Sequence, residues 1–334
     1  MNKIKFGVVG FGNIGKRHVQ HILNNEQAHL VAICDEKIIE EKIEGVRYFT
    51  SLEAMLQDEN IDVVNVCTPN YLHHPHTMLS LQYKKHVVCE KPMAISVSQC
   101  NEMIEAAIEN EKTIFVVKQN RFNEPVQQVK KLMNENVLGN IYFINVNCFW
   151  NRNEYYYNES NWRGKKELDG GCLFTQFSHF IDILYYLFGE IKNVQGLIKN
   201  LNHAYTEVED SGSFVMETIN GAIVNFNFST CSFEKNMEGA ITILAENGTV
   251  KIGGQYLNTI EYQHIKAVQL PEINIVAKSN DYGKYQGSMS NHDKIIANVI
   301  NTLQGKDTIM TNATEGMQVV KIIEEMYRKS NSLK

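Results

Sequence analysis

The sequence predicts a two-domain protein that begins with a doubly wound α/β sheet and continues with an α+β domain built on an antiparallel sheet. Three observations carry this prediction. The 334 residues exceed the roughly 100–200 residues of an ordinary single domain. Strand-like and helix-like segments alternate over the first third, and strand-like runs separated by tight-turn signals follow. We expect the first domain to span residues 1–122 and the second residues 123–334.

The strand-like runs of the first third are short, apolar and rich in valine and isoleucine, as buried parallel strands are. They lie at residues 4–9, 30–34, 62–67, 86–89 and 114–118. Segments with helical spacing lie between them, at residues 14–23, 52–56, 76–81 and 97–108. A repeated strand, helix, strand order implies parallel strands joined by helices.

A glycine motif, G-F-G-N-I-G at residues 10–15, directly follows the first of these strands and opens the first helix. Gly10 permits the tight turn, Gly12 lets the backbone approach a pyrophosphate, and Gly15 allows the helix to pack closely on the strand. The helix N-terminus then faces the phosphates. The sequence therefore predicts a Rossmann dinucleotide-binding domain whose loop, Gly10, Phe11, Gly12, Asn13, Ile14 and Gly15, contacts the cofactor.

Asp35 closes the second strand, twenty residues after Gly15. A carboxylate at this place accepts hydrogen bonds from the adenosine ribose hydroxyls and repels a 2′-phosphate. We therefore expect NAD as the cofactor, although Lys37 leaves NADP open.

Polar residues follow the later strands, at the sheet edge where open α/β proteins bind ligands. We expect further cofactor contacts from Thr68, Pro69, Asn70, His73, Glu90, Lys91 and Gln119, and a substrate contact from Arg121. The histidines at 73, 74 and 76 suggest a metal site, but no second cluster accompanies them, so we expect a helix start there and no metal.

Composition excludes several classes of function. A formal net charge of −6 argues against a general nucleic-acid binder, which needs a basic surface. No apolar run is long enough to span a membrane, and the N-terminus leads into a strand-like segment rather than a signal peptide. Seven cysteines without a C-x-x-C pair indicate reduced thiols. We expect a cytoplasmic protein that binds neither membranes nor nucleic acid.

The second half shows strand-like runs at residues 141–148, 213–217, 222–228 and 240–244. Turn signals, Asn220-Gly221 and Asn247-Gly248, separate them, which favours an antiparallel sheet. Two helical patterns, at roughly 291–304 and 313–329, would close this domain.

With the glycine motif, these loop residues resemble the Gfo/Idh/MocA oxidoreductases, most tellingly in the E-K-P tripeptide at residues 90–92. The resemblance continues through Trp162-Arg163 and residues 170–182, and so covers most of the chain. It implies that Lys91 and His179 flank the nicotinamide and the reacting carbon. It also implies a large, mainly antiparallel second-domain sheet whose open face joins subunits into a homodimer or homotetramer.

Oxidation of a secondary alcohol needs a hydride acceptor, a base and a group that stabilises the alkoxide. NAD⁺ supplies only the first. Burial and a positive nicotinamide both disfavour a charged amine, so Lys91 is either the base or an alkoxide donor. Helical spacing places Thr175 and Asp182 on the face of His179, which we assign as the proton acceptor. Inositol-dehydrogenase-like members carry an aspartate where this chain has Thr175, which leaves the division of labour between Lys91 and His179 open.

Residues 151–166 combine tyrosines and Trp162 with Arg163 and other basic side chains, a composition suited to a nucleotide-sugar. An ordinary surface loop at a subunit interface is the alternative interpretation. Residues 118–125 and 175–182 look similar to members that oxidise UDP-N-acetylglucosamine-derived uronates at carbon 3 in lipopolysaccharide biosynthesis. The open alternatives are a dehydrogenase of a free sugar or inositol, and an NAD-binding regulator without catalysis.

Overall fold

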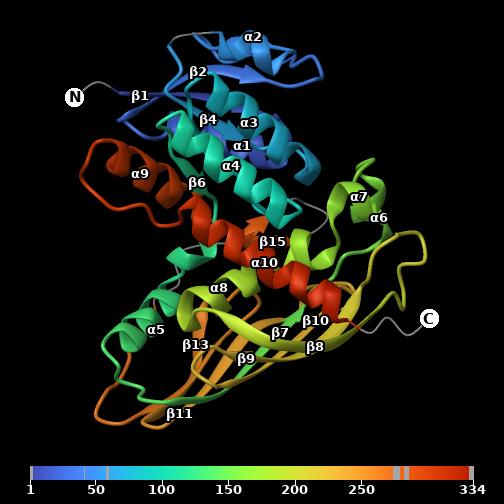
Figure 1. Cartoon of the computed structure of the whole chain (residues 1–334), viewed down its shortest axis with the longest axis vertical. Helices are drawn as coiled ribbons and strands as arrows, with labels where there is room; N and C mark the ends of the chain where they lie inside the picture. Colours follow the sequence, from blue (N-terminus) through green and yellow to red (C-terminus); the bar gives the residue numbers. More distant parts are fainter. Residues whose placement is uncertain (1–2, 41, 58–59, 274–278, 282–285, 331–334) are drawn as a thin grey trace. The chain divides into compact units, whose positions relative to one another are not determined.

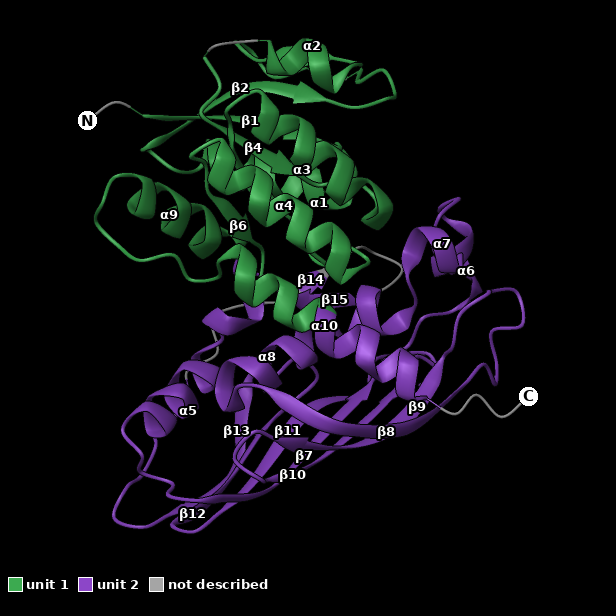
Figure 2. Cartoon of the chain, viewed as in Figure 1, with its two compact units in different colours: residues 1–118, 292–320 green, residues 119–291, 321–334 purple. Residues whose placement is uncertain are grey.

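A computed structural model describes residues 3–40, 42–57, 60–273, 279–281 and 286–330. The chain forms two compact units (Figure 2): residues 1–118 with 292–320, and residues 119–291 with 321–334. The expected boundary followed residue 122 and assigned everything after it to the second domain. In the structure, residues 292–320 belong to the first unit, because helix α9 (His292–Leu303) packs against α1 (Asn13–Leu23).

The first unit contains a six-stranded parallel sheet in the order β3-β2-β1-β4-β5-β6. This confirms the predicted doubly wound fold. The strands are β1 (Ile4–Val9), β2 (Ala28–Cys34), β3 (Arg47–Phe49), β4 (Val63–Val66), β5 (His86–Cys89) and β6 (Ile114–Val116). The register pairs Val9 with both Cys34 and Val66. The loops that follow β1, β2 and β4 therefore begin side by side at one edge of the sheet.

Helices connect these strands as the alternation predicts. They are α1, α2 (Leu52–Leu56), α3 (His73–Gln82) and α4 (Val97–Glu109), with the short η1 (Asn70–Leu72) leading into α3. The strand order reverses direction at β1, and right-handed connections of opposite direction place their helices on opposite faces. In agreement, α3 and α4 lie side by side (Figure 1), whereas α1 packs against α9.

The second unit is built on a seven-stranded sheet in the order β13-β12-β11-β7-β10-β9-β8. Its strands are β7 (Ile141–Phe149), β8 (Ile191–Lys199), β9 (Ser211–Thr218), β10 (Ile223–Ser229), β11 (Glu238–Ala245), β12 (Gly248–Gly253) and β13 (Thr259–Ile265). Two antiparallel meanders, β8 to β10 and β11 to β13, join on opposite sides of β7. All neighbours are antiparallel except β7 and β10, which run parallel.

Helices cover one face of this sheet. The strands alternate buried and more exposed residues, as a sheet packed on one side requires. Helix α8 (Ser178–Phe188) and the preceding π-helical turn η3 (Leu173–Phe177) fill that face (Figure 1), where Phe177 and Phe180 contact Trp150 at ring-centroid distances of 6.1 and 5.4 Å. The second unit also contains η2 (Gln119–Phe122) and α5 (Glu124–Asn134) before β7, and α6 (Glu154–Asn158) and α7 (Lys166–Asp169) between β7 and η3.

The remaining described elements are a small hairpin of β14 (Ser279–Asp281) and β15 (Gln286–Met289), and the long helix α10 (Ala313–Lys329), within which the division between the units falls. Among the helices of the described residues, none combines the length and apolar character needed to cross a membrane.

Candidate active site

The glycine loop after β1 contains two glycines that the fold itself requires and one that it does not. Gly10 has φ +87°, and a Cβ there would lie 2.7 Å from the Cys67 carbonyl oxygen. A Cβ on Gly15 would lie 1.8 Å from the Gly10 carbonyl oxygen. A Cβ on Gly12, in contrast, would meet nothing within 4 Å. The open space beside Gly12 fits the close backbone approach that a pyrophosphate needs.

The N-terminus of α1 is also suited to an anion. Gly12 is its N-cap and supplies no side-chain hydrogen bond, and the first turn contains no acidic residue. The helix dipole and the first N–H groups therefore act on whatever lies in front of the loop, as expected for a phosphate site.

Asp35, which directly follows β2, is held beside this loop. Its Oδ2 accepts the Phe11 N–H at 2.6 Å, and its Oδ1 accepts the Lys37 N–H at 2.9 Å. The side chain is half-buried, and each carboxylate oxygen has a second lone pair. The loop and Asp35 thus fit the pyrophosphate and adenosine ribose of a bound NAD.

The loops after β4 and β5 are tied together by a buried histidine. His73 Nδ1 lies 2.6 Å from the Pro92 carbonyl oxygen, and Nε2 lies 2.8 Å from the Thr68 carbonyl oxygen. Burial lowers the pKa of this imidazole. Thr68 also contacts His76, through Oγ1 and Nδ1 at 3.2 Å, and Asn70 is buried. His73, expected to bind the cofactor, thus joins the two loops.

Lys91 follows the buried Glu90 in the E-K-P tripeptide and is itself half-buried. Its backbone N–H donates to Glu90 Oε2 at 3.1 Å, and the Lys91-Pro92 peptide bond is cis. The carboxylate of Glu90 points to His18 rather than to solvent, with Oε1 2.9 Å from Nε2. Sequence reasoning placed Glu90 among the cofactor contacts and gave no indication of this partner.

In the second unit, His179 is buried near the start of α8. Thr175 lies in the π-helical turn before it, so the two are not simple neighbours on one α-helical face. Turns of this kind occur frequently at functional sites. Asp182, expected on the same face, accepts hydrogen bonds from Arg121 instead, from Nε at 3.0 Å and Nη2 at 2.8 Å.

Arg121 was expected to contact substrate. The structure places it, fully buried, in this bidentate ion pair with Asp182 and over the Tyr186 ring at 4.6 Å. Gln119 is also buried, and its Nε2 donates to Ser288 Oγ at 2.8 Å. The contacts described here give both residues partners within the second unit.

A carboxylate does reach Thr175, from a residue that sequence reasoning missed. The Thr175 hydroxyl donates to Oδ1 of the buried Asp169, whose Oδ2 accepts the Gly164 N–H at 2.6 Å. The chain turns back between Asp169 and Thr175 through Gly170 and Gly171, both with positive φ. Asp169 therefore places a carboxyl group beside Thr175.

In residues 151–166, aromatic and basic side chains contact one another. The Arg163 guanidinium lies 4.3 Å from the ring centroid of Tyr156 and 5.7 Å from that of Trp162. Its Nη1 donates to the Tyr156 carbonyl and to Glu159 Oε2, both at 3.1 Å. Arg152 is buried and donates from Nε to Gln176 Oε1 at 2.7 Å. The segment is thus pre-organised by its own contacts.

Comparison with known proteins decides the family. Residues 4–118 match the model described as the oxidoreductase family, NAD-binding Rossmann fold, and residues 126–251 match the GFO/IDH/MocA C-terminal domain. The chain belongs to the Gfo/Idh/MocA family. It is therefore an oxidoreductase with an NAD-binding Rossmann domain.

Two solved structures are similar over nearly the whole chain. The WlbA dehydrogenase from Bordetella pertussis, in complex with NADH and UDP-GlcNAcA, is 35% identical with a TM-score of 0.88 and covers 98% of this chain and 97% of its own. The WlbA dehydrogenase from Chromobacterium violaceum, with the same two ligands, is 33% identical with a TM-score of 0.89 and covers 99% and 94%. The D-glucoside 3-dehydrogenase of Escherichia coli is 24% identical over 98% of this chain and 96% of its own.

Proposed function

We propose that this protein oxidises the carbon-3 hydroxyl of a UDP-linked N-acetylhexosamine uronate to a ketone, with NAD⁺ as the hydride acceptor. The observation that carries the proposal is the full-length similarity, at about a third identity, to two dehydrogenases whose structures hold NADH and UDP-GlcNAcA. This chain also contains both catalytic candidates, Lys91 and His179.

The reaction assigns separate tasks to these two residues. NAD⁺, held by the glycine loop of residues 10–15 and by Asp35, would supply the acceptor for the hydride of carbon 3. The hydroxyl proton must leave as the carbonyl forms, and His179 accepts it, because an imidazole titrates near neutral pH. Lys91 stabilises the developing alkoxide. The contact between Thr175 and Asp169 holds the π-helical turn that precedes His179.

The substrate is an anion that an acidic protein must meet with local positive charge. The segment 151–166 supplies such charge: the Arg163 guanidinium lies over the Tyr156 ring and near the Trp162 ring, and Lys165 and Lys166 are exposed. Stacked aromatic rings and a guanidinium are suited to a uracil ring and a phosphate. We assign nucleotide-sugar recognition to this segment.

A substrate panel tests the proposal. NADH formation would be followed with UDP-GlcNAcA, UDP-GlcNAc, glucose and myo-inositol. We expect kcat/KM for UDP-GlcNAcA to be at least about 100-fold above kcat/KM for UDP-GlcNAc. A site built to bind the substrate carboxylate rejects an analogue that lacks this group. Turnover of only the free sugar or inositol would contradict the nucleotide-sugar assignment. NADH binding with no turnover of any compound would favour a regulator.

Two variants test the residue roles within that assay. His179→Gln and Lys91→Met should each lower kcat by roughly 100-fold or more, the usual contribution of a general base or an electrostatic group. The affinity for NADH of His179→Gln, measured by fluorescence titration, should stay within about threefold of the native value. A His179→Gln variant with native kcat would remove His179 from the reaction.

We further propose a homo-oligomer formed through the second unit's sheet. Its uncovered face carries large apolar side chains that are about half exposed: Val215 (53%), Ile223 (49%), Leu244 (41%) and Tyr262 (54%). Apolar residues gathered on one open face favour association. Sedimentation velocity should show a dimer or tetramer that the pair Val215→Glu and Ile223→Glu dissociates. A native chain that sediments as a monomer at micromolar concentration would refute this part.

A further inference from the structure

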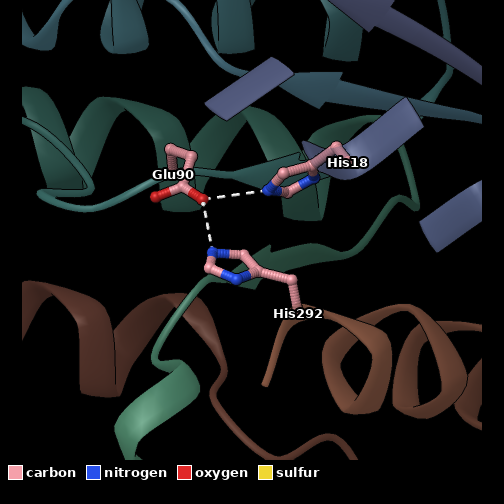
Figure 3. A group of neighbouring side chains, drawn as sticks. All are labelled: His18, Glu90 and His292. Atoms are coloured by element: carbon pink, nitrogen blue, oxygen red, sulfur yellow. Dashed lines mark hydrogen bonds and ion pairs between the residues drawn. The ribbon is translucent and has the colours of Figure 1, made fainter. Parts of the chain in front are cut away.

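Three buried side chains from distant parts of the chain meet inside the first unit (Figure 3). They are His18 from α1, Glu90 from the loop after β5, and His292, the first residue of α9. Their exposed fractions are 0%, 4% and 1%. His18 Nε2 lies 2.9 Å from Glu90 Oε1, and His292 Nε2 lies 3.5 Å from the same oxygen. One carboxylate oxygen thus faces two imidazoles.

The contacts of His18 indicate which of its two ring nitrogens carries the proton. The Asn65 amide nitrogen lies 2.8 Å from His18 Nδ1. In this orientation of the Asn65 amide, its N–H₂ group donates to Nδ1, which places the His18 proton on Nε2, directed to Glu90. Burial by itself would raise the pKa of Glu90, but its contacts with His18 and His292 outweigh burial and hold that pKa well below its usual range. Burial lowers the pKa of His292. Glu90 is therefore a carboxylate with a neutral His292 beside it.

The other oxygen of this carboxylate holds the backbone of Lys91. Glu90 Oε2 accepts the Lys91 N–H at 3.1 Å, and on the far side of Lys91 the Pro92 carbonyl oxygen lies 2.6 Å from His73 Nδ1. Buried side chains thus hold the peptide group that precedes Lys91 and the one that follows Pro92. A buried carboxylate without these partners would be costly, so its contacts leave the loop little freedom.

We propose that His18, Glu90 and His292 are positioning residues that hold Lys91 in its reactive place. In this proposal, none of the three contacts the reacting atoms. The proposal rests on the proposed function of Lys91. His18 supplies the stronger contact and His292, at 3.5 Å, the weaker one. Side chains from α1 and α9 thereby hold the loop after β5. The sequence predicted only that this loop faces a ligand.

Two imidazoles and a carboxylate are also a ligand set for a divalent transition metal. A metal on His18 Nε2 would need the proton on Nδ1 and a hydrogen-bond acceptor beside it. The Asn65 amide N–H₂ group lies there instead. The hydrogen-bonded arrangement is therefore favoured over a metal site. Measuring the metal content of the native protein decides between these two interpretations.

The test compares Glu90→Gln, His18→Ala and His18→Gln with a matched control. His74 forms the same 2.9 Å contact with a glutamate, Glu102, but at the surface, so His74→Gln is that control. We expect Glu90→Gln and His18→Ala to lower kcat about 10- to 100-fold, with the sugar KM and the NADH affinity within about threefold of native. His18→Gln, whose amide N–H₂ can still donate, should recover part of this loss. The control should retain native kcat.

A second readout needs no sugar substrate, so it separates this inference from the substrate assignment. The acylation rate of Lys91 by acetic anhydride, followed by peptide mass spectrometry, should change at least about threefold in Glu90→Gln and His18→Ala but not in His74→Gln. An unchanged Lys91 rate in folded variants would overturn the proposal. Stoichiometric zinc or iron in the native protein, lost in Glu90→Gln, would overturn it in favour of a metal site. If Glu90→Gln does not fold, the comparison of His18→Gln with His18→Ala decides.

Discussion

Gly12 and Gly15 lie three residues apart in one loop, yet their replacement by alanine should have opposite consequences. A Cβ on Gly12 meets nothing within 4 Å, and its φ of −74° suits any residue. Gly12→Ala should therefore cost only about 1 kcal/mol of stability, the usual loss for alanine at an N-cap. The added methyl group would occupy the space beside the loop, so NADH binding should weaken about tenfold or more.

Gly15→Ala should act on the fold instead. Its Cβ would lie 1.8 Å from the Gly10 carbonyl oxygen, against a minimum of about 3.0 Å in real structures. The backbone of α1 or of the loop must move by more than about 1 Å to relieve this clash. Forced displacement in a packed core costs typically 1–3 kcal/mol and sometimes more. The loss should appear without any cofactor present.

Urea unfolding and NADH fluorescence titration of both variants separate these effects. Gly12→Ala should keep its unfolding midpoint close to native and lose affinity, whereas Gly15→Ala should shift the midpoint strongly to lower urea. Native NADH affinity in Gly12→Ala would refute the assignment of the open space to the pyrophosphate. Native stability in Gly15→Ala would refute the clash.

Three further predictions follow from single contacts. Asp35→Ala should lower kcat/KM for NAD⁺ about 10- to 100-fold and affect NADP⁺ less, because hydrogen bonds from the ribose hydroxyls to a carboxylate are lost; an unchanged NAD⁺ to NADP⁺ ratio would contradict the ribose assignment. Arg121→Leu should destabilise the protein by about 3–5 kcal/mol in urea unfolding, since it leaves the buried Asp182 unpaired, and adding Asp182→Leu should restore much of the loss. Burial raises the pKa of Glu209 from 4.5 to about 7, so the stability this residue contributes is present below pH 4.5 and lost as pH rises through 7. Relative to Glu209→Gln, the native protein should thus lose stability on the order of 3 kcal/mol across that range in thermal unfolding, and parallel curves would show that its pKa is unshifted.

Much of the fold was predictable because its signals are local. A buried parallel strand is a short run of apolar residues between polar ends, and the glycine loop must directly follow a strand and open a helix. Strand β3 was missed because residues Arg47–Phe49 form an edge strand of only three residues that stays partly exposed. The parallel pairing of β7 with β10 was also missed, because turn signals report only on strands adjacent in sequence.

The candidate site was less predictable wherever a side chain finds a distant partner. Arg121 pairs with Asp182, 61 residues away, and Glu90 with His18, 72 residues away. Arg121 and Glu90 follow strand ends, where polar residues commonly face ligands. No spacing rule in the sequence reveals their buried partners. Asp169 approaches Thr175 only because two glycines between them reverse the chain. The need for glycine at positions 10 and 15 could be predicted because both are requirements of the backbone itself.

The nucleotide-binding unit is discontinuous, and this affects how the protein can form on the ribosome. Helix α9, which packs against α1 and brings His292 to Glu90, emerges only after the whole sheet of the second unit has been made. During synthesis one flank of α1 therefore stays uncovered until residue 303, the end of α9, has been made. Domains usually fold in order as they emerge. Here the first unit is completed only after the sheet of the second unit, so a translation product that stops after residue 118 would expose the surface of α1 that α9 normally covers.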